Sequence, residues 1–219
     1  MGTSGKILVF VDLPGGELDE TGRGLLSYGA RLAGLLDVPW GAVTALPTDS
    51  AQLSLFGSYG TPTITAMLDC EALLDRPALL GKALAGVAKD EAIQVMILPH
   101  NDLGASLAPA IAQELDAAII TELVSARQSP EGVRLSRKAL GVRIAETRIW
   151  DGSRPLVATV PPRSLSQVLM PTVRPGNPSL STWRPAAPLS GAAAAVIGRI
   201  PPDPQTVDLT EAEVIFSVG

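Results

Sequence analysis

The chain has 219 residues, 46% of them hydrophobic and 18% charged, a composition that supports a full apolar core and excludes a disordered chain. Its 17 Lys and Arg residues against 22 Asp and Glu give a net charge of −5 without a dense run of basic residues, so nucleic-acid binding is not expected. The single cysteine, Cys70, and the single histidine, His100, exclude an internal disulfide, a cysteine-based metal site and chemistry that needs paired imidazoles.

The N-terminal region carries no recognisable targeting segment. It runs directly into a strand-like stretch at residues 6–12, whereas a secretory signal needs a basic region and then a longer apolar run. Apolar runs elsewhere fall far short of the ~20 residues that span a bilayer. We therefore expect no membrane insertion, and a cytoplasmic location or, in a eukaryote, the mitochondrial matrix.

The first half of the chain alternates between two hydrophobic periods. Short apolar stretches, typical of strands covered on both faces, predict strands at residues 6–12, 40–46, 63–68 and 93–98. Apolar residues at helical spacing predict a helix that Thr21 caps and that runs to Leu36, and further helices at residues 51–59, 77–90 and 103–115. This alternation predicts an α/β fold, in which a parallel sheet is covered by helices on both faces.

The pattern changes beyond Asp116. Four strands are predicted, at residues 118–126, 133–140, 142–150 and 156–160, and only short turns separate them. Connections of this length cannot hold crossover helices, so all four strands are expected to be antiparallel neighbours. The sequence therefore predicts that an antiparallel meander extends the parallel sheet.

The next stretch, residues 161–208, contains ten prolines. That density forbids a regular helix and interrupts strands, so we expect an extended arm that runs over the surface of this domain or of a partner. Trp183 is the best candidate for an anchor along the arm. Residues 214–219 then form a fresh strand-like stretch. We expect it either to borrow a sheet edge from this domain or from another copy, or to be held by crystal or partner contacts.

Seven stretches along nearly the whole chain carry a family resemblance. They are an opening strand at residues 6–12, a first helix at 24–33, a strand-to-helix turn with Leu-Ala-Pro at 98–109, the end of that helix at 115–117, and the segments 138–140, 157–160 and 208–214. In this order they resemble the N-terminal part of the alpha subunit of an electron transfer flavoprotein. The chain departs from that family where Ser106 and Ala110 stand at usually basic positions and where Pro161 replaces a frequent Arg.

The resemblance implies a division into three parts. Residues 1–160 would form an α/β domain that resembles electron transfer flavoprotein alpha domain I, with a fold like that of the adenine nucleotide alpha hydrolases. Residues 161–208 would be the proline-rich arm or linker. Residues 209–219 would be the first strand of an FAD-binding domain that is absent or truncated. FAD is implied for the full-length family with its site outside this chain, so residues 1–219 alone are expected to bind none.

The function implied by the resemblance is that of an electron-carrier subunit rather than an enzyme. In the family, the flavin carries electrons from dehydrogenases towards a membrane quinone reductase. This chain would be a scaffold and docking domain that pairs with a beta-like subunit or self-associates, and the resemblance assigns it no catalytic, cofactor-binding or metal-ligating residue. The alternative is a stand-alone module that binds a small ligand or an adenine nucleotide on the same sheet.

Two segments at expected strand ends allow a functional and a structural interpretation. The turn Leu13-Pro14-Gly15-Gly16 could cradle a phosphate, but the neighbouring carboxylates, beginning with Asp12, would repel it, so a plain turn is favoured. His100 could act as a general base with Asp102 as its orienting carboxylate. No nucleophile lies nearby in sequence, and Asn101 or Asp102 is better explained as the cap of the next helix.

The remaining candidate residues have structural roles as their favoured interpretation. Cys70 stands between two acidic residues, which indicates a structural thiol rather than a reactive one. Trp150 is expected to pack in the core. Five basic residues gather in the meander and could form an anion site, although a solvated sheet face is favoured: Arg134, Arg137, Lys138, Arg143 and Arg148. Arg134 and Lys138 share one face of their predicted strand.

Overall fold

The computed structural model describes residues 5–46, 49–140, 143–165, 178–186, 189, 214, 216 and 217. The centre of the fold is a seven-stranded sheet in which every pairing of neighbours is parallel. Its strands, in spatial order, are β10 (Ser179–Trp183), β3 (Thr63–Met67), β2 (Trp40–Thr44), β1 (Lys6–Phe10), β4 (Ile93–Pro99), β9 (Leu156–Val160) and β5 (Ala118–Ile120).

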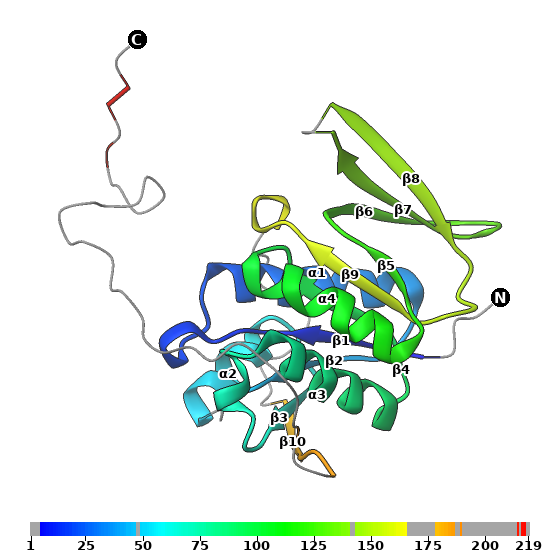
Figure 1. The fold of residues 1–219 in the computed structure, drawn as a ribbon. Coiled ribbons are helices and arrows are strands. Elements are labelled where there is room, and N and C mark those ends of the chain that lie inside the picture. The colour runs from blue at the N-terminus through cyan, green and yellow to red at the C-terminus, as the bar shows by residue number, and fades with distance from the viewer. Residues whose placement is uncertain are drawn as a thin grey trace.

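Helices cover both faces of this sheet, as the sequence predicts (Figure 1). They are α1 (Glu20–Leu36), α2 (Ser50–Ser58), α3 (Pro77–Asp90) and α4 (Asp102–Leu115), with short 3-10 turns η1 (Pro14–Gly16), η2 (Glu71–Leu73) and η3 (Pro162–Ser164). Alternate residues of β1 point to opposite faces, so Ile7 and Val9 join the core on the α1 side and Leu8 and Phe10 join the core with α3 and α4. Burial of both faces explains why the interior strands β1, β4 and β9 are almost continuously apolar.

A second, three-stranded antiparallel sheet forms the meander, with β6 (Leu123–Ser129), β7 (Gly132–Ala139) and β8 (Ile144–Trp150) in that order. Figure 1 shows it projecting from the domain beyond β9 and β5. Its inner face, including Val133, Leu135 and Trp150, belongs to the same apolar cluster as α1. The meander is therefore fixed to the domain by its own core residues.

The structure corrects the expected place of residues 156–160. They form β9, which lies parallel between β4 and β5 in the large sheet, and are not part of the antiparallel meander. The short segment after β8 passes from one sheet to the other instead of closing a hairpin. All five β9 residues are buried, as expected of an interior parallel strand.

Two further details differ from the sequence predictions. The strand predicted at residues 118–126 is divided into β5 and β6, because Glu122 adopts a left-handed backbone conformation with φ of 56° that ends the first strand. The cap of α1 is Asp19, whose side chain accepts a 2.7 Å hydrogen bond from the N–H of Gly22, and not Thr21.

Part of the expected extended arm is the edge strand β10, which the sequence does not predict as a strand. It pairs with β3, and Trp183 at its end donates a 2.7 Å hydrogen bond from Nε1 to the carboxylate of Asp90 in α3. The predicted anchoring role of Trp183 is thus confirmed, with the domain's own helix as the surface. Most of the arm lies outside the described residues, and so do residues 215, 218 and 219 of the expected last strand, so its pairing stays a prediction; Val214 and Phe216 are described and exposed. No helix within the described ranges is long and apolar enough to cross a bilayer.

Candidate functional site

The strand order reverses between β1 and β4, and the carboxyl ends of these strands open onto a cavity of about 630 Å³. Such switch points are the usual ligand sites of open parallel sheets. One wall is the turn after β1, in which Gly15 and Gly16 have φ values of 64° and 84° that favour glycine. The side-chain amide of Gln52 donates to the carbonyl oxygen of Gly16 and holds the turn in place.

Carboxylates dominate the polar lining of this crevice. Asp12 and Glu71 both face it, among leucine side chains. Burial raises the pKa of Asp12; a hydrogen bond from the backbone of Leu13 opposes this, and the nearby charge of Asp19 adds to it. A phosphate or pyrophosphate placed here would meet like charge, so these residues do not fit the pyrophosphate of FAD or the phosphates of a nucleotide.

The segment His100 to Asp102 joins the end of β4 to helix α4. Asn101 caps α4, since its side chain accepts a 2.9 Å hydrogen bond from the N–H of Gly104, which confirms the predicted cap. Asp102 is the first residue of the helix and does not orient His100. The carboxylate beside the imidazole belongs instead to Glu122, whose Oε1 is 3.5 Å from Nε2 of His100.

Thr159 of β9 completes this cluster. Its hydroxyl oxygen lies 2.8 Å from Nδ1 of His100 and accepts a 3.2 Å hydrogen bond from the backbone N–H of Glu122. The hydroxyl proton can then be donated to Nδ1, which leaves the imidazole proton on Nε2, facing the carboxylate of Glu122. Thr159 is fully buried, so no substrate can reach its hydroxyl as a nucleophile. The cluster ties the β5–β6 junction to the ends of β4 and β9.

A second cavity, of about 400 Å³, lies between edge strand β5 and the meander. Arg137 reaches into it, donating a 3.0 Å hydrogen bond to the hydroxyl of Thr121, and its Nε is 3.5 Å from a carboxylate oxygen of Glu146. The same Glu146 accepts a 2.6 Å hydrogen bond from Nε of Arg148. Two of the five basic residues singled out in the sequence therefore share one carboxylate in this groove.

The other basic residues of the meander are not in the groove. The strand pairing places Arg134 opposite Arg127, and Arg134 and Lys138 share the outer face as their spacing predicts. Both are exposed, and so is Arg143 near the tip. They form a solvated sheet face, the interpretation that the sequence favours.

Two exposed apolar residues line the same groove. Of the large apolar residues exposed in the described part of the chain, four lie on β5, on β8 or in the turn before β8: Ile119, Leu140, Ile144 and Ile149. Ile119 and Ile149 line the groove itself and are 46% and 47% exposed. Leu180, at the opposite edge of the large sheet, is exposed to the same degree, 45%, but lines none of the cavities described above.

Cys70 and Trp150 have the structural roles that the sequence favours. Cys70 is fully buried, and burial, with the charge of Asp69, raises the pKa of its thiol, which disfavours the reactive thiolate. Trp150 is buried, and its indole N–H donates a 2.8 Å hydrogen bond to the carbonyl oxygen of Arg154. No group of three or more His, Cys, Asp or Glu side chains that could hold a metal ion occurs within the portion of the chain that the structure describes.

The electron transfer flavoprotein domain family matches residues 8–200. The chain belongs to this family. The match spans the large sheet, the meander and β10, and it confirms the resemblance seen in the sequence at the level of the domain family. Members of the electron transfer flavoprotein family are electron carriers rather than typical enzymes, and they function in complexes with partner subunits. The chain matches no curated protein.

Proposed function

We propose that this electron transfer flavoprotein domain is an alpha-subunit-like scaffold, which docks a beta-like partner subunit and has no catalytic role of its own. The observation that carries the proposal is that two half-exposed isoleucines, Ile119 and Ile149, line the groove between β5 and the meander. Exposed apolar side chains on a groove that polar residues border are typical of interaction sites.

The groove has the composition of a protein interface. Ile119 and Ile149 are its exposed apolar lining residues, and Arg137, Glu146 and Arg148 are polar lining residues whose charges are already paired. Paired charges lose less hydration free energy on burial than an isolated charge does. The family's use of partner subunits supports a heterodimer, with a second copy of the chain as the alternative occupant.

The flavin, in this proposal, is held outside the described domain. The crevice at the switch point carries two carboxylates, and in the meander groove, of about 400 Å³, both guanidinium groups are already paired with Glu146. We expect purified chain to lack flavin absorbance. The proposal keeps residues 1–160 as the scaffold, 161–208 as the arm and 209–219 as the start of a flavin-binding domain, and it places the protein in the cytoplasm or, in a eukaryote, the mitochondrial matrix.

Docking can be tested by co-expression with a beta-like subunit from the same organism, followed by gel filtration. Ile119→Asp and Ile149→Asp should weaken the complex at least about tenfold, because a carboxylate would be buried against the partner. Leu180→Asp is the matched control, since it introduces the same charge at equal exposure on the opposite sheet edge. Failure of the wild-type chain to bind the subunit, or equal loss in all three variants, would contradict the proposal.

The crevice of about 630 Å³ at the switch point supports one alternative, a module that binds a small ligand. Its carboxylates favour a neutral or cationic ligand over an adenine nucleotide. A thermal-shift titration separates the two, because a ligand that binds the folded state raises its stability. Adenosine that stabilises the chain more than AMP or ATP would support the small-ligand module; stabilisation by the nucleotides would contradict our assignment of the ligand charge.

A further inference from the structure

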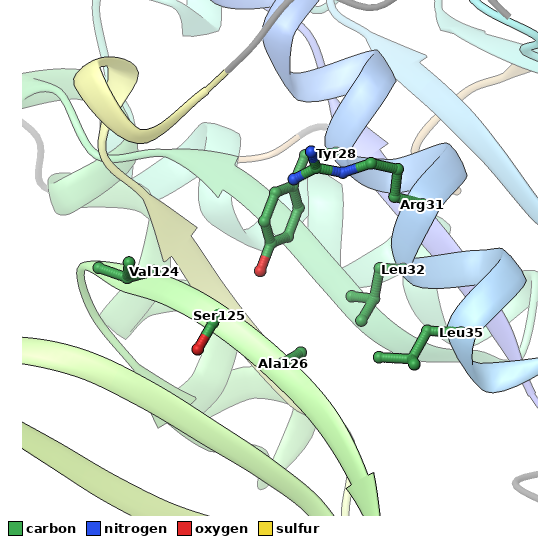
Figure 2. Close-up of a pocket in the computed structure, with 7 residues that line it drawn as sticks. All are labelled: Tyr28, Arg31, Leu32, Leu35, Val124, Ser125 and Ala126. Atoms are coloured by element: carbon green, nitrogen blue, oxygen red, sulfur yellow. The ribbon is translucent and has the colours of Figure 1, made fainter.

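A third cavity, of about 280 Å³, lies between helix α1 and strand β6, away from the groove and from the sheet switch point (Figure 2). Leu32 and Leu35 of the helix and Ala126 of the strand give it apolar walls. Its volume is just below the ~300–1,000 Å³ of drug-sized ligand pockets, so it suits only a small molecule. Neither the family match nor the proposed docking function assigns a role to this cavity.

The unusual feature of the cavity is the hydroxyl group of Tyr28. The tyrosine is only 6% exposed, and in the described structure its oxygen has no hydrogen-bond partner. Figure 2 shows this hydroxyl pointing into the space between α1 and β6. Buried polar groups are almost always hydrogen-bonded, and leaving one unpaired costs free energy. The hydroxyl is therefore a donor that a molecule in the cavity would satisfy.

The charge around this donor favours an anion. Burial raises the pKa of Tyr28 to about 12, against a smaller opposing effect of Arg31, so the hydroxyl keeps its proton at neutral pH. The guanidinium of Arg31 lies 5.6 Å from the centre of the tyrosine ring and puts a positive charge at the exposed side of the cavity. A neutral O–H donor and a guanidinium on the lining of one cavity match the needs of a carboxylate.

The strand side of the cavity is also incompletely paired. β6 is the outermost strand of its sheet and pairs only with β7 among the described strands, and its pairing is irregular between Leu123 and Ser125. An edge strand presents backbone N–H and C=O groups that have no strand partner. The position of the strand relative to α1 is fixed by a hydrogen bond from the side-chain amide of Gln128 to the carbonyl oxygen of Leu35.

We propose that the cavity between α1 and β6 binds a small monocarboxylate with a short apolar body. The carboxylate accepts the hydrogen bond of Tyr28 and lies near Arg31, and the apolar body packs on Leu32, Leu35 and Ala126. The cavity, the unpartnered buried hydroxyl and the adjacent cation are three separate observations. Together they specify the charge, the size and the polarity of the ligand.

Binding can be measured by calorimetry and by amide chemical shifts with benzoate and 3-methylbutanoate as probes, and with benzamide as the uncharged analogue. Tyr28→Phe removes only the hydroxyl and should weaken benzoate about tenfold. Arg31→Gln should weaken it several-fold at low salt and less at high salt. Tyr59→Phe, at a second buried tyrosine that does not line this cavity, is the matched control and should bind as the wild type does.

The proposal requires chemical-shift changes centred on Leu32 and Ala126 that saturate with benzoate. It is overturned if neither carboxylate binds, if Tyr28→Phe binds benzoate as tightly as the wild type does, or if benzamide binds as tightly as benzoate. A comparison of the melting temperatures of the four proteins without ligand separates loss of the site from loss of the fold.

Discussion

Replacement of Tyr28 by Phe should stabilise the protein in the absence of ligand, although removal of a hydroxyl from a core usually destabilises it. The side chain is 6% exposed and its oxygen is unpaired, so the folded state bears the cost of dehydrating a hydroxyl without a compensating hydrogen bond. That cost is about 1–3 kcal/mol. Removing the oxygen should recover about 1 kcal/mol, which corresponds to a rise of about 2–4 °C in melting temperature for a domain of this size.

Alkaline pH gives a second measurement on the same variant. Tyr28 has its pKa raised from 10.0 to about 12 in the folded state, so the folded protein holds this proton more tightly than the unfolded chain does. The resulting stability is fully present below pH 10 and is lost as the pH rises from 10 to about 12, by roughly 2–3 kcal/mol. The stability of Tyr28→Phe should fall correspondingly less over this range.

Urea unfolding at pH 7 and between pH 9 and 11.5 tests both statements. Tyr59→Phe serves as the control for the general effect of removing a buried tyrosine hydroxyl. If Tyr28→Phe is less stable than the wild type by 0.5 kcal/mol or more, an amount typical of losing a real hydrogen bond, then a partner such as an ordered water satisfies the hydroxyl. The inference of an unpaired donor in the cavity would then be wrong.

Three further predictions concern other contacts. Gly104→Ala should destabilise the protein by about 3 kcal/mol in urea unfolding, because the added Cβ would lie 1.8 Å from the carbonyl oxygen of Pro99. Gly34→Ala, at which the added Cβ would meet only open space, should stabilise α1 by about 0.5–1 kcal/mol. Asp12→Asn should raise the melting temperature at pH 7. The pKa of Asp12 is raised in the folded state, so the stability that the protonated carboxyl contributes is present at acid pH and is lost as the pH rises through that pKa. An unchanged or lowered melting temperature of the variant would contradict this. Trp183→Ala should release β10 from α3 and speed amide exchange of β10 about tenfold, while equal effects on β10 and β1 would indicate global unfolding instead.

The first half of the fold could be predicted because its signals are local. The helix α3, with bounds 77–90, and the cap at Asn101 follow from spacing and residue type within a single element. The place of β9 in the large sheet could also have been predicted from its composition, although the short turn before it suggested an antiparallel neighbour. Its residues, Leu156–Val160, are almost uniformly apolar like those of β1, whereas β8 has three consecutive polar residues in its middle. Uniform apolarity is typical of an interior parallel strand.

Other features depend on contacts between distant parts of the chain and leave no local signal. β10 is polar because it is an edge strand, and it pairs with β3, which precedes it by more than 100 residues. Glu122 meets His100 only because β9 lies between β4 and β5. The hydroxyl of Tyr28 belongs to an ordinary amphipathic helix in the sequence, and only the packing of β6 against α1 leaves it buried without a partner.

The cluster of His100, Thr159 and Glu122 connects the site of proposed docking to the rigid core. The meander leaves the large sheet at Thr121 and Glu122, directly after β5, so the conformation of these two residues sets the direction in which β6 begins. Glu122 is held there by a hydrogen bond from its backbone N–H to Thr159, and Thr121 is held by Arg137 of β7. Both contacts act on the same junction, one from the buried end of β9 and one from the groove. A partner that displaces Arg137 from Thr121 therefore acts on the junction that orients the meander, while the buried Thr159 keeps the junction attached to the sheet. This arrangement explains how a three-stranded sheet that projects from the domain can still present its apolar side chains in a fixed orientation.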